Sequence, residues 1–437
     1  MNRTYRIDDG RQTLVLAARN DRLPEVVYWG TALPLTENLD TLHAAHVIDV
    51  TGGMLDENPD LSICPEATRS FPGQPGLIVR DSDGTPLLPK FCFESVTQNG
   101  TLELTYKDAA NGLTLSVSFA SDPETHVITC QTTLDASRPV HLHWLAAPVL
   151  PGPQQSDEMI DVSGRWCGEF QLSRTAWAPG MRYRENRTGR TGHEHFPGLI
   201  VPCRSATNTE GEAYAFHYGW SGGHKMIAEE LQDGRRQIQW GHAARMETEA
   251  ATQFKTAPLY ISYSNTGLNG CAVAFQRHLR DRIVTWPKPD APRPVHYNCW
   301  EAVYFDHKLP VLQDIADRAA KLGAERFVLD DGWFGNRDDD TRSLSDWTVD
   351  PRKYPDGLHP LIEHVHSLGM TFGIWFEPEM INEDSDIHRA HPDWVLGSED
   401  QTLGRQQKAL NMALPAVRDY LYDRMSAILR DHQIDYI

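Results

Sequence analysis

Two short apolar segments of this chain each end in carboxylates and a tryptophan. The first, residues 327–329, continues as Asp330-Asp331-Gly332-Trp333, and the second, residues 372–374, continues as Trp375-Phe376-Glu377-Pro378-Glu379. Adjacent carboxylates accept hydrogen bonds from neighbouring hydroxyl groups, and an indole ring offers a flat apolar face to a sugar ring. These residue types therefore favour binding of a neutral, hydroxyl-rich ligand such as a carbohydrate.

Continuous apolar runs of this length are typical of parallel strands that are buried on both faces. Ligands of parallel sheets bind outside the carboxyl ends of the strands, so polar residues at that position are candidates for binding or chemistry. The alternative for a lone aspartate after a strand is a cap on the next segment or on loop amides. Repetition of the pattern on two strands favours the binding interpretation.

The composition indicates a large acidic protein with more than one domain, because 437 residues exceed the roughly 250–300 at which a single core stops growing. The net charge of −19 argues against nucleic acid as a partner. No stretch approaches the roughly 18–20 apolar residues of a membrane span, and the start lacks the apolar core of a signal peptide. The seven cysteines are an odd number without close pairs, which predicts reduced thiols and a cytoplasmic protein with no membrane partner.

The pattern of apolar and polar residues changes near residue 286. Before that point apolar and polar residues alternate, as in 102–106 and 113–119, which predicts a large antiparallel sandwich over 1–285 that ends in a helix over 270–284. Prolines 287, 289, 292 and 294 mark a stiff linker over 286–294. Beyond it, residues 295–437 alternate strands and helices, with Gly323 and Gly369 at helix ends, which indicates parallel βαβ units.

The second domain carries four predicted strands, over 295–304, 326–330, 370–376 and 434–437, with helices over 309–322, 359–368 and 416–432. A closed (β/α)8 barrel needs eight strands and usually about 250 residues, whereas only about 150 follow the linker. We therefore expect the first half of a (β/α)8 TIM barrel, and a chain that is a fragment cut within that domain.

Several motifs in a fixed order resemble the glycoside hydrolase family 36 α-galactosidases. In the second domain they are Asn298-Cys299-Trp300-Glu301-Ala302-Val303-Tyr304-Phe305, Leu329-Asp330-Asp331-Gly332-Trp333-Phe334-Gly335, Asp346-Trp347, Tyr354-Pro355-Asp356-Gly357-Leu358 and Gly373-Ile374-Trp375-Phe376-Glu377-Pro378-Glu379-Met380. In the first domain they are Cys64-Pro65-Glu66-Ala67 and Gly189-Arg190-Thr191-Gly192-His193-Glu194. The resemblance implies a β-supersandwich, a catalytic (β/α)8 barrel, a small carboxyl-terminal β domain, and tetramers in which a sandwich loop helps to close a neighbour's site.

The resemblance also implies a retaining hydrolase that removes terminal α-linked galactose from sugars such as melibiose and raffinose. The positions that match the family's galactose contacts are Trp300, Asp330, Asp331, Trp375 and Arg405. The two aspartates would bind the axial hydroxyl, the tryptophans would stack on the pyranose ring, and the arginine would donate to ring hydroxyls. Barrel packing is the alternative for each tryptophan, and a surface ion pair is the alternative for the arginine.

The catalytic carboxylates that the resemblance implies lie beyond residue 437, so no catalytic residue is assigned in this chain. A retaining mechanism needs two carboxyl groups about 5–5.5 Å apart, and the family's nucleophile lies in a Lys-Trp-Asp run after the fourth strand. Asp435 lies inside that strand pattern and is no substitute for it. Glu377 and Glu379 are interpreted as site scaffolding or as part of an ion-pair network.

No metal and no cofactor are expected. The pairs His193-x-His195 and His364-x-His366 have no third ligand at usable spacing. The acidic tract 338–340 lacks the spaced ligands of a calcium loop and is interpreted as a solvated acidic loop. No phosphate-binding glycine motif follows a strand.

Two alternatives to α-galactosidase remain open. In the first, the chain is complete but inactive, and acts as a carbohydrate-binding or assembly module whose open half barrel exposes strand edges. In the second, the chemistry is kept and the sugar is α-linked N-acetylgalactosamine, because the hydroxyl at the second carbon would be bound by residues beyond the cut.

Overall fold

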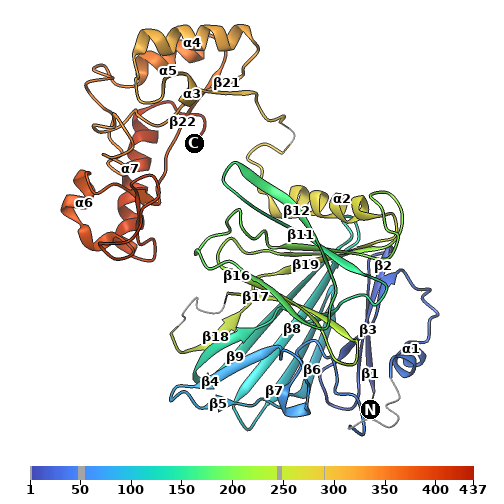
Figure 1. Cartoon of the computed structure of the whole chain (residues 1–437). Coiled ribbons are helices and arrows are strands. Elements are labelled where there is room, and N and C mark those ends of the chain that lie inside the picture. Colours follow the sequence, from blue (N-terminus) through green and yellow to red (C-terminus); the bar gives the residue numbers. More distant parts are fainter. Residues whose placement is uncertain (1, 48–54, 244–248, 290) are drawn as a thin grey trace. The chain divides into compact units, whose positions relative to one another are not determined.

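The computed structural model describes residues 2–47, 55–243, 249–289 and 291–437, and it divides into two compact units (Figure 1). The first unit is Met1–Trp286 and the second is Pro287–Ile437. The division falls inside the proline-rich segment 286–294, of which Asp290 lies outside the described residues. Within the described ranges, no helix is long and apolar enough to cross a membrane.

The first unit consists mainly of antiparallel strands in three sheets, counted over the described residues. One sheet contains β1 (Arg3–Asp8), β2 (Gln12–Ala18) and β3 (Glu25–Thr31). A second has the order β10 (Leu150–Pro151), β17 (Arg236–His242), β16 (His224–Glu230) and β13 (Gly180–Glu185). The largest has the order β12 (Gly168–Ala176), β11 (Glu158–Arg165), β14 (Gly198–Pro202), β15 (Ala213–Tyr218), β19 (Leu259–Ser264), β9 (Val127–Leu145), β8 (Leu113–Asp122), β7 (Thr101–Asp108) and β6 (Cys92–Asn99). In addition, β18 (Ala251–Lys255) and β4 (Leu77–Asp81) pair with β9, and β5 (Pro86–Leu87) pairs with β4.

The alternating pattern of the sequence produces the sandwich, as the sequence predicted. Leu104 of β7 lies opposite Val117 of β8, and Leu102 lies opposite Phe119; all four side chains are buried. Their polar neighbours along each strand point to the other face, since successive strand residues alternate sides. The apolar faces of the sheets therefore share one core.

Two features of the first unit are not evident from the sequence pattern. Apolar and polar residues alternate over 127–134 and again over 140–146, but both runs belong to the single strand β9, because β8 pairs with it before the polar stretch between them and β4 pairs with it after that stretch. The sandwich also contains a helix that the sequence analysis did not predict, α1 (Leu39–His46). The side chain of Asn38 accepts hydrogen bonds from the Asp40 and Thr41 N–H groups in the first turn of that helix.

The first unit ends in the helix that the sequence predicted, with shifted bounds. The helix α2 (Leu268–His278) begins after Gly267 and continues as the π-helical turn η2 (Leu279–Ile283). Gly267 has a φ of 75°, a conformation that glycine adopts without strain. A short 3₁₀ turn, η1 (Ala67–Arg69), lies in the motif segment near residue 64.

The second unit contains three parallel strands in the order β20 (His296–Asn298), β21 (Arg326–Leu329) and β22 (Thr371–Ile374). Its helices are α3 (Trp300–Val303), α4 (Leu309–Lys321), α5 (His359–Ser367), α6 (Asp386–Ala390) and α7 (Pro415–Asp431), with a 3₁₀ turn η3 (Pro392–Trp394) and a small pair β23 (Met380–Ile381) and β24 (Lys408–Ala409). Gly323 and Gly369 follow α4 and α5 with φ of 92° and 79°, as the sequence predicted for helix ends. This is the first part of a (β/α)8 barrel.

Two predicted strands of the second unit are shorter than expected. Only residues 296–298 of the predicted strand 295–304 are extended, because the side chain of Asn298 accepts a hydrogen bond from the Trp300 N–H (2.7 Å) and turns the chain into α3. The predicted strand 434–437 is reduced to one parallel bridge between Tyr436 and Gly373. That bridge nevertheless places residue 436 beside β22, where a fourth strand would lie.

Candidate sugar-binding site

The carboxyl ends of β20, β21 and β22 lie side by side. Asn298 pairs with Val328, and Leu329 pairs with Ile374, so each strand ends at nearly the same level of the sheet. The Trp375 N–H donates to the Leu329 carbonyl (2.9 Å) and extends this alignment past the last paired residues. The residues that follow the three strands are therefore brought to one edge, as the sequence predicted from the two acidic motifs.

Trp300 begins the short helix α3 directly after β20. Its ring makes edge-to-face contacts with Tyr304 and Phe305, each with a centroid distance of 5.1 Å, and the residue is half-buried. Tyr304 ends the helix with a φ of 48°, a conformation that non-glycine residues rarely adopt. The two aromatic contacts fix the orientation of the indole while part of its surface stays accessible.

Asp330 follows β21 and is partly exposed. Its Oδ2 accepts a hydrogen bond from Asn298 Nδ2, and its Oδ1 accepts one from the Asp331 N–H (2.7 Å). A carboxylate can accept about four hydrogen bonds, so two positions remain open. This group is oriented by the protein and is still able to bind a pair of hydroxyls.

Asp331 is placed differently from its neighbour. It is only 2% exposed, and its two oxygens accept a bidentate pair of hydrogen bonds from the fully buried Arg337, at 2.9 Å from Nε and 2.8 Å from Nη2. Its contribution to sugar binding therefore stays a prediction, while its ion pair with Arg337 is a structural feature of the site.

Trp375 follows β22 and is also half-buried. Its ring lies nearly parallel to Phe334 (centroids 6.4 Å apart) and packs against Trp347 (6.1 Å). Its carbonyl accepts a hydrogen bond from the indole N–H of Trp333 (2.9 Å). Barrel packing, the alternative considered from sequence, is thus part of its role, and stacking on a sugar remains a prediction.

Arg405 is brought to this edge by the pairing of β23 with β24. It lies in a tight turn with a φ of 50°, and it forms an ion pair with Asp340 (3.0 Å) in which both side chains are about half exposed. The surface ion pair expected as the alternative for Arg405 is therefore present. Binding of ring hydroxyls by the same guanidinium stays a prediction.

Glu377 connects the charges of the site. Burial raises its pKa, Arg405 lowers it, and the carboxylates of Glu379 and Asp331 raise it. Because these groups act on one carboxyl, Arg405 and Asp331 lie in the same electrostatic neighbourhood. The Glu377 carboxylate accepts a hydrogen bond from Gln407 Nε2 (3.3 Å), and its place in an ion-pair network stays a prediction.

The acidic tract 338–340 is more than a solvated loop. Asp338 pairs with Arg352 (2.9 Å) and Lys353 (3.2 Å), and the hydrogen bond from Arg352 holds its pKa below the usual range. Asp340 lies between Arg405 and Arg337, at 3.0 and 3.8 Å. The three side chains are 44–52% exposed, as a solvated loop requires, and the structure adds ion pairs that the sequence did not predict.

Arg337, Asn298 and Asn382 were missed as organisers of the site. Each has at least one hydrogen-bond partner far away in the sequence: Asn298 donates to Asp330, and Arg337 donates to Asn382. The sequence feature that could have pointed to Arg337 is the clustering of opposite charges in the run Arg-Asp-Asp-Asp-Thr-Arg over residues 337–342.

The histidine pairs considered as metal ligands have other partners. His364 Nε2 lies 2.9 Å from Asp317, His366 Nε2 lies 2.9 Å from Asp435, and His195 Nδ1 lies 2.9 Å from Arg184. Among the described residues, no three His, Cys, Asp or Glu side chains are grouped so that they could hold a metal ion.

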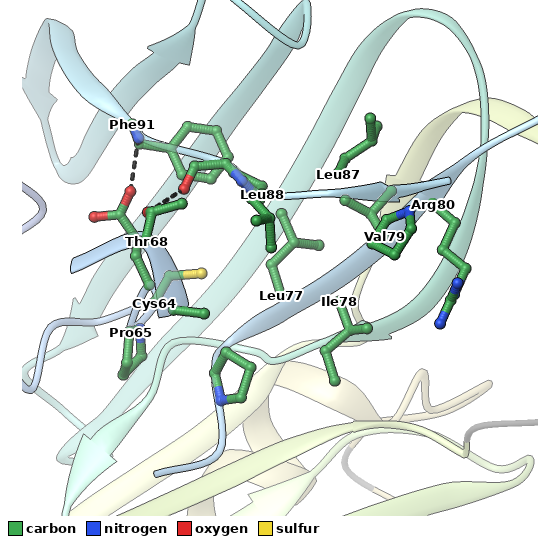
Figure 2. Close-up of a pocket in the computed structure, with 15 residues that line it drawn as sticks. Cys64, Pro65, Thr68, Leu77, Ile78, Val79, Arg80, Leu87, Leu88 and Phe91 are labelled. Carbon is green, nitrogen blue, oxygen red and sulfur yellow. Dashed lines mark hydrogen bonds between the residues drawn. The ribbon is translucent and has the colours of Figure 1, made fainter. Parts of the chain in front are cut away.

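The motif at Cys64 lines a pocket of about 190 Å³ in the first unit, which Figure 2 shows. Apolar side chains of β4 and β5, among them Leu77 and Val79, form much of its wall. The Glu66 carboxylate accepts a hydrogen bond from the Phe91 N–H (2.7 Å), and burial raises the pKa of the Cys64 thiol. The polar groups of the motif hold the loop in place, which is a structural role.

Two family models match this chain: the Glycosyl hydrolase family 36 N-terminal domain over residues 22–247 and Melibiase over residues 253–437. An α-galactosidase from Escherichia coli is 40% identical, with 94% of this chain and 59% of that protein covered. The α-galactosidase AgaA from Geobacillus stearothermophilus is 33% identical, with 80% and 49% covered.

Solved structures agree with these matches. The α-galactosidase from Lactobacillus brevis has a TM-score of 0.91 at 28% identity, over 100% of this chain and 63% of its own. A variant of Geobacillus stearothermophilus AgaA in complex with raffinose has a TM-score of 0.89 at 28% identity, over 99% and 64%. The chain thus spans between 49% and 64% of the length of these relatives.

Proposed function

This chain belongs to the glycoside hydrolase family 36 α-galactosidases, and on that premise we propose that it supplies the galactose-binding part of a hydrolase that releases terminal α-linked galactose, with retention, from sugars such as melibiose and raffinose. The observation that carries the proposal is the meeting of Trp300, Asp330 and Trp375 at the ends of three adjacent parallel strands. Two indole rings at the same sheet edge as an oriented carboxylate suit a pyranose with a hydroxyl pair on one side.

The described residues account for recognition and orientation of the sugar. Asp330 accepts hydrogen bonds from hydroxyls, Trp300 and Trp375 contact the C–H face, and Arg405 donates from the rim. Asp331, held by the bidentate pair with Arg337, is the second carboxylate proposed to contact the sugar. Neither the nucleophile nor the acid/base residue is assigned among the described residues, and hydrolysis is proposed for the whole protein to which this sequence belongs.

Calorimetry on the 437-residue chain tests the proposal. We expect binding of galactose and of 1-deoxygalactonojirimycin, the ligand named for a solved relative, with glucose bound at least about tenfold more weakly. Asp330→Asn is expected to lower galactose affinity about tenfold, since it removes a charged acceptor. Equal affinity for glucose and galactose, or no binding at all, would contradict the proposal.

The same titrations separate the alternatives. Tighter binding of N-acetylgalactosamine than of galactose would favour the N-acetylgalactosaminidase alternative. Galactose binding by the whole protein without release of aryl α-galactoside would favour an inactive carbohydrate-binding module.

We further propose a homo-oligomer, a tetramer as the family resemblance implies. Support comes from the hairpin of β11 and β12, where Trp166, Phe170 and Leu172 are 75%, 69% and 73% exposed. Exposed apolar surface of this kind is typical of protein–protein interfaces. Light scattering of the wild type and of Phe170→Ser/Leu172→Ser is the test: we expect a smaller assembly in the variant, and a monomeric wild type would contradict the proposal.

We also propose that the protein is cytoplasmic. The seven cysteines all lie in described segments and are all free, five of them buried, which supports folding in a reducing compartment. Fractionation of the native cells tests this; recovery of the protein outside the cytoplasm would contradict it.

A further inference from the structure

Asn382 lies directly after β23, is fully buried, and uses every hydrogen-bonding position of its side-chain amide. Its Oδ1 accepts from Arg337 Nη1 (2.8 Å) and from the Leu344 N–H (3.2 Å). Its Nδ2 donates to the carbonyls of Asp340 and Gln406, both at 3.0 Å. An amide has two donors and two acceptor positions, so none remains free, and reversing the amide would set donors against donors and oxygens against carbonyls.

These hydrogen bonds lead to two charged groups of the candidate sugar site. On one side, Arg337 makes the bidentate pair with Asp331. On the other side, the Gln406 carbonyl belongs to the turn that presents Arg405, whose side chain bonds to Asp340. Asn382 thus bonds directly to Arg337, which holds Asp331, and to the carbonyl of Gln406, the residue that follows Arg405.

The turn at Arg405 needs such support. Arg405 and Gln406 have φ of 50° and 59°, two consecutive non-glycine residues in the left-handed region. Residues in this region persist only where surrounding contacts hold them, and such conformations concentrate at functional sites. Two backbone carbonyls of this turn accept hydrogen bonds: Gly404 from the Gln407 N–H (3.0 Å), and Gln406 from Asn382 Nδ2 (3.0 Å).

We propose that Asn382 is a positioning residue that holds the buried Asp331–Arg337 pair and the exposed Arg405 turn in one arrangement suited to a sugar. It acts through these partners without touching the ligand. The inference rests on the proposed galactose site, and it adds to that site a residue which none of the sequence motifs includes.

A substitution of Asn382 can remove its two donated hydrogen bonds while keeping an oxygen that accepts from Arg337. Asn382→Asp keeps an oxygen for Arg337 and Leu344 but replaces both donations to the Asp340 and Gln406 carbonyls by repulsion. We expect faster amide hydrogen exchange over residues 339–344 and 404–407, with β21 and β22 still protected. Asn382→Ser, which keeps one donor, gives the same comparison if the aspartate variant does not fold.

The coupling to Arg405 is measured by a double-mutant cycle on galactose affinity. Asn382→Asp and Arg405→Ala are each expected to weaken binding about tenfold, and the double variant no more than about tenfold, because both remove the same guanidinium contact. A purely structural loss of stability would not produce this non-additivity.

Gln239 is the matched control, an equally buried amide in the first unit. It accepts from the Trp144 indole N–H and donates to the Gln74 carbonyl and to Gln237 Oε1, each at 2.8 Å. Gln239→Glu is expected to lower the unfolding temperature and to leave both galactose affinity and exchange at 404–407 unchanged.

Additive effects of Asn382→Asp and Arg405→Ala, or unchanged exchange at 404–407, would overturn the inference. If the wild type binds neither galactose nor 1-deoxygalactonojirimycin, the proposed function fails, and the exchange result alone then decides whether Asn382 positions the turn.

Discussion

The two units bury charge in different ways. In the first unit, the buried Glu66 pairs with Arg69, whose side chain is still 17% exposed. In the second unit, Asp331 and Arg337 are 3% and 0% exposed, so both members of the pair have left water. Burying a complete ion pair costs several kcal/mol per ion before any contact is counted. The difference indicates that the strand ends of the second unit retain a costly buried charge pair beside the candidate sugar site, whereas the pair at Glu66 keeps one partner in contact with water.

Loss of one member of the fully buried pair tests this comparison most strongly. Arg337→Met is expected to lower the free energy of unfolding by about 3–5 kcal/mol, because it leaves the Asp331 charge buried without a partner. Arg69→Met should cost only about 1–2 kcal/mol, since Glu66 keeps its hydrogen bond from Phe91 and its pKa is already raised by burial. Urea unfolding of the two variants measures both values.

A double replacement sharpens the same test. Asp331→Leu combined with Arg337→Met removes both charges and is expected to recover much of the lost stability. If Arg337→Met and Arg69→Met lower the free energy of unfolding equally, the exposure of the arginine does not determine the effect, and the contrast between the two ion pairs is contradicted.

The sequence predicted the positions that depend on periodicity and missed those that depend on distant partners. Leu329 and Ile374 belong to apolar runs, so strands, and hence the place of Asp330 and Trp375, could be derived locally. Asn382 stands in a run of polar residues, Asn-Glu-Asp-Ser-Asp, that resembles a solvated loop. Its burial depends on chain segments about 40 residues before it and 24 after it, which no local pattern encodes.

The same limit explains why the different partners of the two aspartates could not be predicted. Asp330 and Asp331 are chemically identical neighbours, and sequence reasoning treated them as one sugar-binding pair. The strand ends at Leu329, so the next two side chains diverge, one toward Asn298 and one toward Arg337. Their hydrogen-bond partners differ because Arg337 folds back onto Asp331 alone.

One buried histidine in each unit, in contrast, should make a similar contribution to acid sensitivity. His224 in the first unit and His307 in the second are both buried, and burial lowers the pKa of each to about 4. Each is neutral when folded and takes up a proton on unfolding below its ordinary pKa of 6.5. The stability each contributes is therefore complete above pH 6.5 and is lost as the pH falls from 6.5 to 4, by about 1–3 kcal/mol per residue.

Unfolding curves at several pH values check this expectation. His307→Gln and His224→Gln should each reduce the loss of stability between pH 6.5 and 4 by comparable amounts relative to the wild type. If only one of the two variants changes the pH dependence, the two buried histidines differ in their effect on acid stability, and this difference would be a further contrast between the units.

Asparagines at helix starts give a finer test. Asn38 caps α1 in the first unit, and Asn298 accepts from the Trp300 N–H in the second while also donating to Asp330. Replacing either by alanine should cost about 1 kcal/mol of stability, but only Asn298→Ala should also weaken galactose binding, by about tenfold. An affinity unchanged in Asn298→Ala would show that Asp330 does not need this donor.

The smallest effect on stability is expected at Arg405. Its ion pair with Asp340 is about half exposed, and exposed pairs contribute about 0–1 kcal/mol, so Arg405→Ala should change the free energy of unfolding by less than about 0.5 kcal/mol. Arg204→Ala, which removes the exposed pair with Asp157 in the first unit, should have the same small effect and serves as the control. Galactose affinity should separate the two variants, falling about tenfold in Arg405→Ala alone. A large loss of stability in Arg405→Ala would instead show that this arginine stabilises the fold of the second unit. In that case Arg405 would not be a residue kept mainly for ligand binding.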